Sequence, residues 1–409
     1  MTASPSPSRG DIEMRRAVLI DIVRSPFGKG KPGGILSGLH PVDLYAQILK
    51  GLVNRVGIDP SLIEDVITGC VLQVGEQAGN IGRQAVLAAG LPESVPAVTL
   101  DRKCGSAQQA IDFAAQGVIA GAYDVVVGGG VEMMSLIPMK SNRMGRDSEG
   151  KELKKRYPAG LVHQGISAEL IAARWDISRE AMDRFALQSH HRASAAQDSG
   201  VTASAIIPVS VPHEDGTIVV SADEGIRRDS SMEALSALKP AFFDEAMEQR
   251  FPEISWSVTA GSSSQITDGA AAALIMEQGL AHRLGLRPRM VFSHFATVGY
   301  DPILMLTGVI PATEKLLARA GLSIDEVDLF EVNEAFASIP LAWQKHFGVP
   351  SERLNIFGGA IAIGHPVGAS GGRLLANLIA GLEADRGRYG VLTMCESGGM
   401  SNATLIERL

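Results

Sequence analysis

The chain has 409 residues, 45% of them hydrophobic and 20% charged, so it is long enough for two or three packed units and too apolar to be disordered. Its net charge of −8, from 37 basic and 45 acidic residues, argues against a general nucleic-acid-binding protein. Three cysteines exclude a disulfide scaffold and favour a reducing compartment, the cytoplasm. No apolar run reaches the ~18 residues of a membrane span, and no histidine or cysteine spacing predicts a metal site.

The chain is expected to begin with a flexible tail, residues 1–13, because this stretch is polar and rich in serine and proline. After it, short apolar runs alternate with runs of helical periodicity, a pattern typical of an α/β protein. The predicted strands are 17–23, 66–71, 97–100 and 125–127, and the predicted helices are 42–56 and 107–118.

The middle of the chain has a different character, since charge density rises and strand signals become sparse. Residues 139–258 are therefore predicted to form an inserted loop domain with helices at 167–175 and 180–196. This loop domain would be inserted into an N-terminal half, which is made of residues 14–138 and 259–286. Residues 287–409 would form the C-terminal half. Seven basic residues near its start are interpreted as a solvated loop: Lys140, Arg143, Arg146, Lys151, Lys154, Lys155 and Arg156.

The two α/β portions look like copies of one unit. Residues 97–115 and 327–341 share the order strand, polar loop, helix, and 125–135 resembles 391–401. The sequence thus predicts a duplicated unit in which Asn333 occupies the place that Cys104 has in the first half. A site between the halves would draw residues from both.

Two glycine-containing patterns match known functional motifs, but the residues around them argue against both functions. The GxGxxG match at 28–33 contains Pro32, which breaks the helix that a dinucleotide site requires. The GxSxG match at 368–372 would make Ser370 a nucleophile, but His365 is the last histidine, so no histidine follows to complete a hydrolase triad.

Two of the three cysteines and one histidine remain as candidates for chemistry. Cys104 stands at a predicted helix start beside Lys103, where helix N–H groups and positive charge favour a thiolate, although a buried structural cysteine is the alternative. His365 lies in a glycine-rich loop that favours presentation to a ligand over a structural role. Cys395 ends a strand at a glycine turn whose N–H groups can face an oxyanion, whereas Cys70 is interpreted as a core residue.

Four segments together resemble the signature segments of the thiolase family, and they occur in the family's order. They are DRKCGSAQQA (101–110), NEAFA (333–337), GGAIAIGHPVGASGG (358–372) and CESGG (395–399). The resemblance extends from residue 17 to 409 and includes HQGISAE (163–169) and TAGSSSQITDGAA (259–271). It implies a five-layered αβαβα fold with two duplicated halves and an inserted loop domain, and a homodimer or homotetramer.

The resemblance implies roles for the catalytic candidates. Cys104 corresponds to the acylated nucleophile, His365 to its base, and Cys395 to the acid/base at the acetyl carbon. Asn333, with a water, and His365 correspond to one oxyanion site, and the backbone N–H groups of Cys104 and Ser397 to a second. These parts suit a retro-Claisen cleavage, which needs a soft nucleophile, a base, a carbon acid/base and donors for two oxyanions.

The resemblance also implies which positions of this chain contact the substrates. Arg227, Ala260 and Ser264 correspond to positions that hold coenzyme A, and His163 and Phe336 to the acyl pocket. Coenzyme A enters as a substrate, and the resemblance implies no permanently bound cofactor.

Three departures from the family pattern affect the expected specificity. Ser397 stands where glycine is frequent, Gln164 replaces a methionine common in short-chain biosynthetic members, and Phe357 replaces a polar residue. We expect a degradative 3-ketoacyl-CoA thiolase. The alternatives are a biosynthetic acetoacetyl-CoA thiolase, a condensing enzyme of the same superfamily, and a non-catalytic acyl-CoA-binding protein. Asn333 and Cys395 argue against the condensing enzymes, which pair their cysteine with two histidines.

Overall fold

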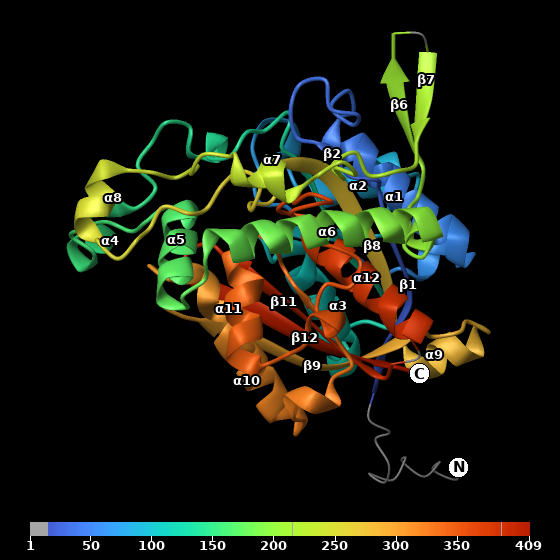
Figure 1. The fold of residues 1–409 in the computed structure, drawn as a ribbon. Helices are drawn as coiled ribbons and strands as arrows, with labels where there is room; N and C mark the ends of the chain where they lie inside the picture. Colours follow the sequence, from blue (N-terminus) through green and yellow to red (C-terminus); the bar gives the residue numbers. More distant parts are fainter. Residues whose placement is uncertain (1–14, 215, 386) are drawn as a thin grey trace, which may run out of the picture.

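The computed structural model describes residues 15–214, 216–385 and 387–409. The predicted tail, 1–13, lies outside the described residues. A large sheet runs through the centre of the molecule, and the helices of the segment 139–258 lie along one side of it (Figure 1). None of the helices in the described ranges is long and apolar enough to cross a membrane.

The large sheet has the strand order β10-β11-β12-β9-β1-β8-β5-β3-β4, with the short β2 paired to β8. The strands are β1 (Ala17–Arg24), β2 (Gly28–Lys29), β3 (Asp65–Gly69), β4 (Ala97–Leu100), β5 (Val125–Met133), β8 (Thr267–Glu277), β9 (Met290–Gly299), β10 (Leu329–Val332), β11 (Tyr389–Glu396) and β12 (Met400–Arg408). A short antiparallel contact between β1 and β9, at Val18–Val291 and Leu19–Met290, joins the strands of the two halves.

The predicted strands are confirmed, but β5 is longer than expected. It continues through Gly128 to Met133 because its glycines let neighbouring backbone come close. A Cβ on Gly128 would stand 2.7 Å from Cα of Ile111 in the helix above it. The glycines that looked like a strand end are thus the places where a helix rests on the sheet.

Helices form three layers around the strands. On the outer faces lie α1 (Pro41–Val56) with α2 (Ile81–Ala88), and α10 (Val309–Ala320) with α11 (Ser338–Phe347). Between the halves lie α3 (Ser106–Ala120) and α12 (Ser370–Asp385), whose buried side chains share one hydrophobic core with strands of both halves (Figure 1). Two further cores fill the outer contacts. The fold is therefore the expected five-layered αβαβα arrangement.

The duplication is real, but one of its predicted correspondences is wrong. In the first half the strand order is β4-β3-β5-β8-β1, and in the second half β10-β11-β12-β9 repeats its last four positions. Leu354, which makes a parallel bridge to Phe330 in β10, stands in the place of β4. The counterpart of Cys104 is thus the loop that follows Leu354 and carries His365, and Asn333 corresponds to the end of β3.

The error has a physical reason: every βαβ unit reads as strand, loop and helix, so the local pattern cannot tell which unit matches which. The second predicted correspondence, 125–135 with 391–401, is confirmed, because β5 and β11 hold the same position in their halves.

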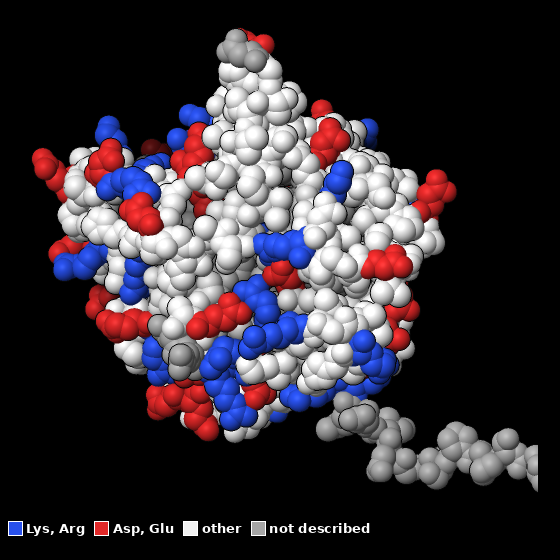
Figure 2. Space-filling view, turned by 90° about the vertical axis from the view of Figure 1, so that its right-hand side faces the viewer, with Lys and Arg blue, Asp and Glu red and all other residues white. Residues whose placement is uncertain are grey.

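The segment 139–258 contains both the predicted helices and an unpredicted hairpin. Its helices are α4 (Gly150–Arg156), α5 (Gln164–Arg174), α6 (Arg179–Ser199), α7 (Met232–Ser236) and α8 (Glu245–Arg250); a further short helix, α9 (Gln278–Arg283), connects β8 to β9. The hairpin of β6 (Val209–His213) and β7 (Gly216–Val220) stands off the body as a column with few charged side chains (Figures 1 and 2). β6 alternates, with Val209 and Val211 buried and Ser210 exposed, but only over these few residues within a charged, largely helical segment.

Candidate functional site

Cys104 lies between β4 and α3, two residues before the helix begins, and is 5% exposed. Its own backbone N–H and that of Ser397 reach the sulfur, and with Lys103 they favour the thiolate. Burial outweighs these effects and, with the neighbouring Glu396 charge, raises the pKa of Cys104 to about 12. The helix start and Lys103 favour the thiolate as expected, but burial outweighs them, so the thiol needs a base such as His365.

His365 is held in the loop before α12 by two acceptors for its backbone N–H, the Gln265 carbonyl and the Thr267 hydroxyl, each at 3.0 Å. Its Nδ1 lies 2.6 Å from Oγ of Ser370, and that hydroxyl donates to the Pro366 carbonyl at 2.9 Å. With that hydroxyl donating to the Pro366 carbonyl, the hydrogen-bond network assigns the ring proton to Nδ1.

The free nitrogen of His365, Nε2, has no hydrogen-bond partner among the described residues. Burial, followed by the charge of Arg373, lowers the pKa of His365 to about 3. The imidazole is therefore neutral, with its tautomer fixed and its lone pair on Nε2, which is the form that a general base requires.

Cys395 and Asn333 lie at the ends of the adjacent strands β11 and β10, where the Asn333 backbone N–H donates to the Thr393 carbonyl at 3.1 Å. Burial and the charges of Cys104 and Glu396 raise the pKa of Cys395. The two thiols therefore share one site and oppose each other's ionisation. The Asn333 amide contacts Cys395 and favours its thiolate weakly, but neither amide atom has a full hydrogen bond within the described ranges.

The conformation of the turn after Cys395 shows whether a serine fits at position 397, where glycine is frequent in the family. The left-handed residues of this turn are Gly398 (φ +91°) and Gly399 (φ +78°), while Ser397 is absent from the residues with positive φ in the described chain. A side chain at 397 is therefore compatible with a backbone N–H that points at Cys104.

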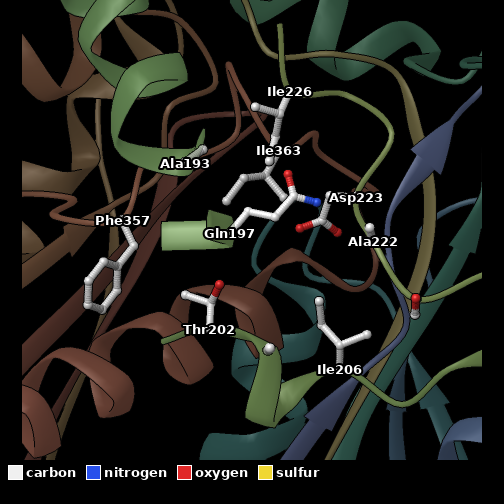
Figure 3. Close-up of a pocket in the computed structure, with 11 residues that line it drawn as sticks. Ala193, Gln197, Thr202, Ile206, Ala222, Asp223, Ile226, Phe357 and Ile363 are labelled. Carbon is white, nitrogen blue, oxygen red and sulfur yellow. The ribbon is translucent and has the colours of Figure 1, made fainter. Parts of the chain in front are cut away.

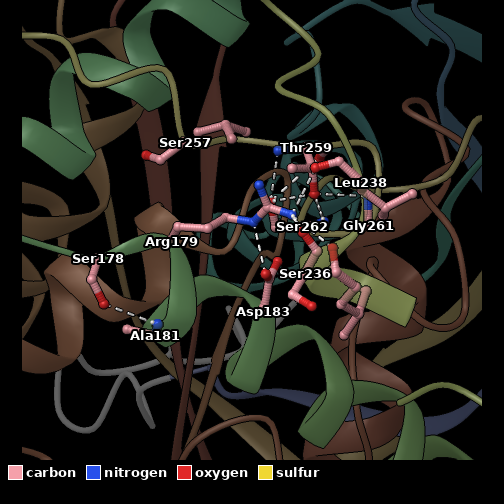
Figure 4. Close-up of polar contacts among 12 residues, drawn as sticks. Ser178, Arg179, Ala181, Asp183, Ser236, Leu238, Ser257, Thr259, Gly261 and Ser262 are labelled. Atoms are coloured by element: carbon pink, nitrogen blue, oxygen red, sulfur yellow. Dashed lines mark hydrogen bonds and ion pairs between the residues drawn. The ribbon is translucent and has the colours of Figure 1, made fainter. Parts of the chain in front are cut away.

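The segment 259–264 packs against the NEAFA segment (333–337). The Ser264 backbone N–H donates to the Ala335 carbonyl at 2.9 Å, and Ser263 bridges to Phe336. Ala260 is exposed beside a turn in which the Thr259 backbone N–H donates to Ser262 (Figure 4). Two of the predicted coenzyme A positions thus lie next to the strand end that carries Asn333.

His163 and Phe336 are connected by a third ring, which the sequence did not single out. Phe242 lies 5.9 Å from the His163 ring and 5.6 Å from the Phe336 ring, between centroids. A Cβ on Gly165 would stand 2.3 Å from the Phe242 ring, so this glycine makes room for it. Burial and the charge of Lys140 lower the pKa of His163, so the start of the basic segment is near the ring.

Arg227 lines a surface groove of about 520 Å³ together with Ile226, Arg228, Asp229, Ser230, Ala234, Leu235 and Leu238. One wall of the groove is held by Arg179, whose Nη2 donates to the Leu235 carbonyl at 2.6 Å and the Leu238 carbonyl at 2.9 Å, while its Nε donates to Asp183 (Figure 4). The other wall is fixed by the Arg227 backbone N–H, which donates to Nδ1 of His190.

A second cavity, of about 230 Å³, lies behind the His365 loop (Figure 3). Phe357 and Ile363 of that loop line it, so Phe357 packs near the loop. None of the catalytic candidates faces this cavity. Cys70 is fully buried, as expected of a core residue, and lies against Glu132.

Sequence reasoning missed the residues that position the loop. Nε2 of Gln265 donates to the carbonyls of Gly225, Ile361 and Ala362 and so joins the groove to the loop of His365. Ser370 was considered only as a nucleophile, yet its position five residues after His365, at the first turn of α12, was the available signal for a partner of that ring. In the described part of the chain, no group of three His, Cys, Asp or Glu side chains is arranged to hold a metal ion.

Comparison with known proteins identifies the family. The model of the N-terminal thiolase domain matches residues 17–279, and that of the C-terminal thiolase domain matches 286–408. The chain belongs to the thiolase family, and it is an acyltransferase.

Individual relatives cover nearly the whole chain. The steroid 3-ketoacyl-CoA thiolase FadA6 of Mycobacterium tuberculosis is 45% identical over 97% of this chain and 95% of its own length. A 3-ketoacyl-CoA thiolase of Aliivibrio fischeri is 41% identical over 97% of this chain and its full length. The crystal structure of the Bacillus anthracis acetyl-CoA acetyltransferase superposes with a TM-score of 0.86 at 35% identity, over 97% of this chain and 99% of that one.

Proposed function

We propose that this thiolase cleaves 3-ketoacyl-CoA with coenzyme A to acetyl-CoA and a shortened acyl-CoA, through an acyl-cysteine. The observation that carries the proposal is the pair of buried thiols, Cys104 and Cys395, with the unpaired Asn333 amide beside the second thiol. His365, buried and neutral with a free Nε2, supplies the base from the loop before α12. Relatives named 3-ketoacyl-CoA thiolase support the same reaction.

In the first half-reaction, Nε2 of His365 takes the Cys104 proton as the sulfur attacks the ketone carbon. The bond to the acetyl carbon then breaks, its electron pair forms the acetyl-CoA enolate, and Cys395 supplies the proton that completes acetyl-CoA. Asn333 and the protonated His365 stabilise the enolate oxygen, and the backbone N–H groups of Cys104 and Ser397 stabilise the tetrahedral oxyanion.

In the second half-reaction, the thiol of free coenzyme A attacks the acyl-Cys104 thioester and gives its proton to the Cys395 thiolate left by the first half-reaction, while the protonated His365 returns its proton to the departing Cys104 sulfur. The shortened acyl-CoA leaves, and Cys104 is protonated again, which gives ping-pong kinetics. The neutral resting state of His365 supports both proton transfers.

For the substrates, we assign coenzyme A to the groove of Arg227 and to Ala260 and Ser264, and the acyl group to the aromatic wall of His163 and Phe336. Arg227 and Arg228 bring positive charge to the groove, which suits a phosphate-bearing ligand, while Arg228 also pairs with Asp198 and Asp229 lines the same groove. Coenzyme A is a substrate in this proposal, with no permanently bound cofactor and no nucleic-acid partner.

The acyl group is the least constrained part of the proposal. The similarity to FadA6 favours a degradative enzyme with a bulky, ring-derived acyl chain, in the manner of β-oxidation. The similarity to an acetyl-CoA acetyltransferase favours the second candidate, condensation of two acetyl-CoA molecules.

Coenzyme A-dependent thiolysis of acetoacetyl-CoA, a long-chain 3-ketoacyl-CoA and a ring-bearing 3-ketoacyl-CoA tests the proposal. A kcat/KM at least tenfold higher for one of the larger substrates is expected. Preference for acetoacetyl-CoA would favour the biosynthetic enzyme, and ligand binding without any turnover would favour the acyl-CoA-binding protein.

We also propose a cytoplasmic homodimer or homotetramer, with 139–258 as its loop domain. Apolar side chains exposed at the β4 edge and on α3, Val98 at 46% and Phe113 at 44%, support association. Light scattering on the purified protein should give a mass of two or four chains, and a monomer would contradict the proposal.

A further inference from the structure

Glu396 is a buried carboxyl group in the site that the mechanism above does not use. It follows Cys395 at the end of β11 and is fully buried. Neither carboxyl oxygen has a hydrogen-bond partner among the described residues, and Oδ1 of Asn402, on the adjacent β12, also lacks one. Three unpaired polar atoms therefore lie together in the interior, where unpaired groups are costly.

These atoms gather at Gly105, the residue after the nucleophile. A Cβ on Gly105 would stand 2.1 Å from Oε1 of Glu396 and 3.0 Å from Oδ1 of Asn402. The amide of Asn402 is oriented by its Nδ2, which donates to the Gly105 carbonyl at 3.4 Å. Its Oδ1 consequently needs a donor, and a carboxylic acid at Glu396 provides one, whereas a carboxylate provides only two more acceptors.

The charges that face Glu396 also oppose its ionisation. Asp101, in the segment before Cys104, disfavours a carboxylate, and so does Asp112, in α3, once it loses its own proton, whereas Arg102 favours a carboxylate. Burial is the largest influence, and the pKa of Glu396 rises to about 8. In turn, a charge on Glu396 raises the pKa of both Cys104 and Cys395.

We propose that Glu396 is a positioning residue that remains protonated while Cys104 reacts, donating its O–H to Asn402 and thereby fixing Gly105 and the start of α3. This inference rests on the proposed role of Cys104 as the nucleophile. The acid keeps the surroundings of the sulfur neutral, so that the developing thiolate meets no negative charge. When Glu396 loses its proton, the Asn402 contact and this neutrality are both lost.

Alkylation of Cys104 by iodoacetamide tests the proposal without requiring turnover. The rate would be followed by mass spectrometry of the Cys104 peptide in the wild type, in Glu396→Gln, and in Glu93→Gln, an exposed control. At pH 6.5 all three should react within twofold of one another. At pH 9.5, Glu396→Gln should react about tenfold faster than the other two, since a like charge shifts a pKa by about a unit or more.

The other outcomes overturn the inference in distinct ways. Faster alkylation of Glu396→Gln at both pH values means a permanently ionised Glu396, and equal rates at both mean no influence on the sulfur. If Glu396→Gln does not fold, the pH dependence of Cys104 alkylation in the wild type still tests the proposal. Its rate should rise less than tenfold per pH unit between pH 7.5 and 9, and a full tenfold rise contradicts the proposal.

A positioning role also predicts that two variants of Glu396 differ in kcat. Glu396→Ala, which cannot donate to Asn402, should lower kcat about tenfold or more at pH 7, and Glu396→Gln, which can, should restore most of it. Equal loss in both variants would overturn the hydrogen bond. If alkylation behaves as expected and no 3-ketoacyl-CoA is cleaved, the proposed function fails while the role of Glu396 stands.

Discussion

Ser370 accepts the Nδ1 proton of His365 at 2.6 Å because its own hydroxyl proton is committed to the Pro366 carbonyl. This relationship decides which nitrogen of the ring is basic. A hydroxyl free to rotate could have donated to Nδ1 instead, and Nε2 would then have carried the proton. The residue that failed as a hydrolase nucleophile is thus the partner that orients the base.

Replacing Ser370 by alanine should therefore lower kcat about 10- to 100-fold with little change in KM, because the ring loses its fixed tautomer and orientation. Ser293→Ala is the matched control, since Ser293 makes the same kind of contact with Nδ1 of His294, on β9. Steady-state thiolysis measures both, and an unchanged kcat for Ser370→Ala would show that the tautomer needs no partner.

Cys104→Ser should abolish both thiolysis and condensation, because a serine hydroxyl is a far weaker nucleophile and the site already disfavours ionisation of a thiol. Intact-mass spectrometry after incubation with acyl-CoA should detect an acyl adduct in the wild type and none in the variant. Turnover retained by the serine variant is incompatible with the nucleophile assignment.

Cys395→Ala should separate acylation from proton transfer. The variant should still acquire an acyl group on Cys104 from acyl-CoA, but lose exchange of the acetyl methyl protons of acetyl-CoA with D2O by about 10²-fold or more. Cys70→Ala is the control, because Cys70 is equally buried and lies against Glu132 away from the second thiol. Exchange at the wild-type rate in Cys395→Ala would assign the proton to another group.

Arg179→Met should weaken binding of coenzyme A without altering the chemistry, because Arg179 holds the carbonyls of Leu235 and Leu238 at the groove wall. We expect KM for coenzyme A to rise about three- to tenfold and kcat to stay within twofold. Arg184→Met, one turn further along α6 and exposed, should change neither. A fall in kcat with an unchanged KM would contradict assignment of coenzyme A to this groove.

Asp112 gives a prediction for stability against pH. Burial raises the pKa of Asp112 to about 8 despite a hydrogen bond from Thr404, so it folds as the acid while the unfolded chain ionises near pH 4. Its contribution is fully present below pH 4 and is lost as pH rises towards 8.

Asp112→Asn should consequently have the wild-type free energy of unfolding at pH 4 and exceed it at pH 8 by about 2–5 kcal/mol. Urea unfolding at the two pH values measures the difference. Glu253→Gln, at an exposed position, should show no such pH dependence. An Asp112→Asn protein less stable than the wild type at pH 8 would mean that the native state holds a carboxylate.

Local patterns were sufficient for most elements but not for their equivalence. Apolar runs located β1 and β4, and helical periodicity located α1 and α6, because each of these signals lies within one continuous stretch of sequence. The β6–β7 hairpin escaped because its alternating strand, β6, is short and its partner β7 is almost wholly exposed. The pairing of Asn333 with Cys104 failed because strand order is set by hydrogen bonds between distant segments.

The sequence by itself supplied the candidate groups: its four segments resemble the thiolase signature segments, and that resemblance implies a nucleophile, a base, a second thiol and an amide. Only the tertiary structure decided the protonation states, the tautomer and the contacts of these groups. Burial makes Cys104 a neutral thiol and His365 a neutral base, Ser370 sets the tautomer, and Glu396 meets Asn402 at Gly105. These properties depend on desolvation and on contacts between residues hundreds of positions apart, which no local pattern contains.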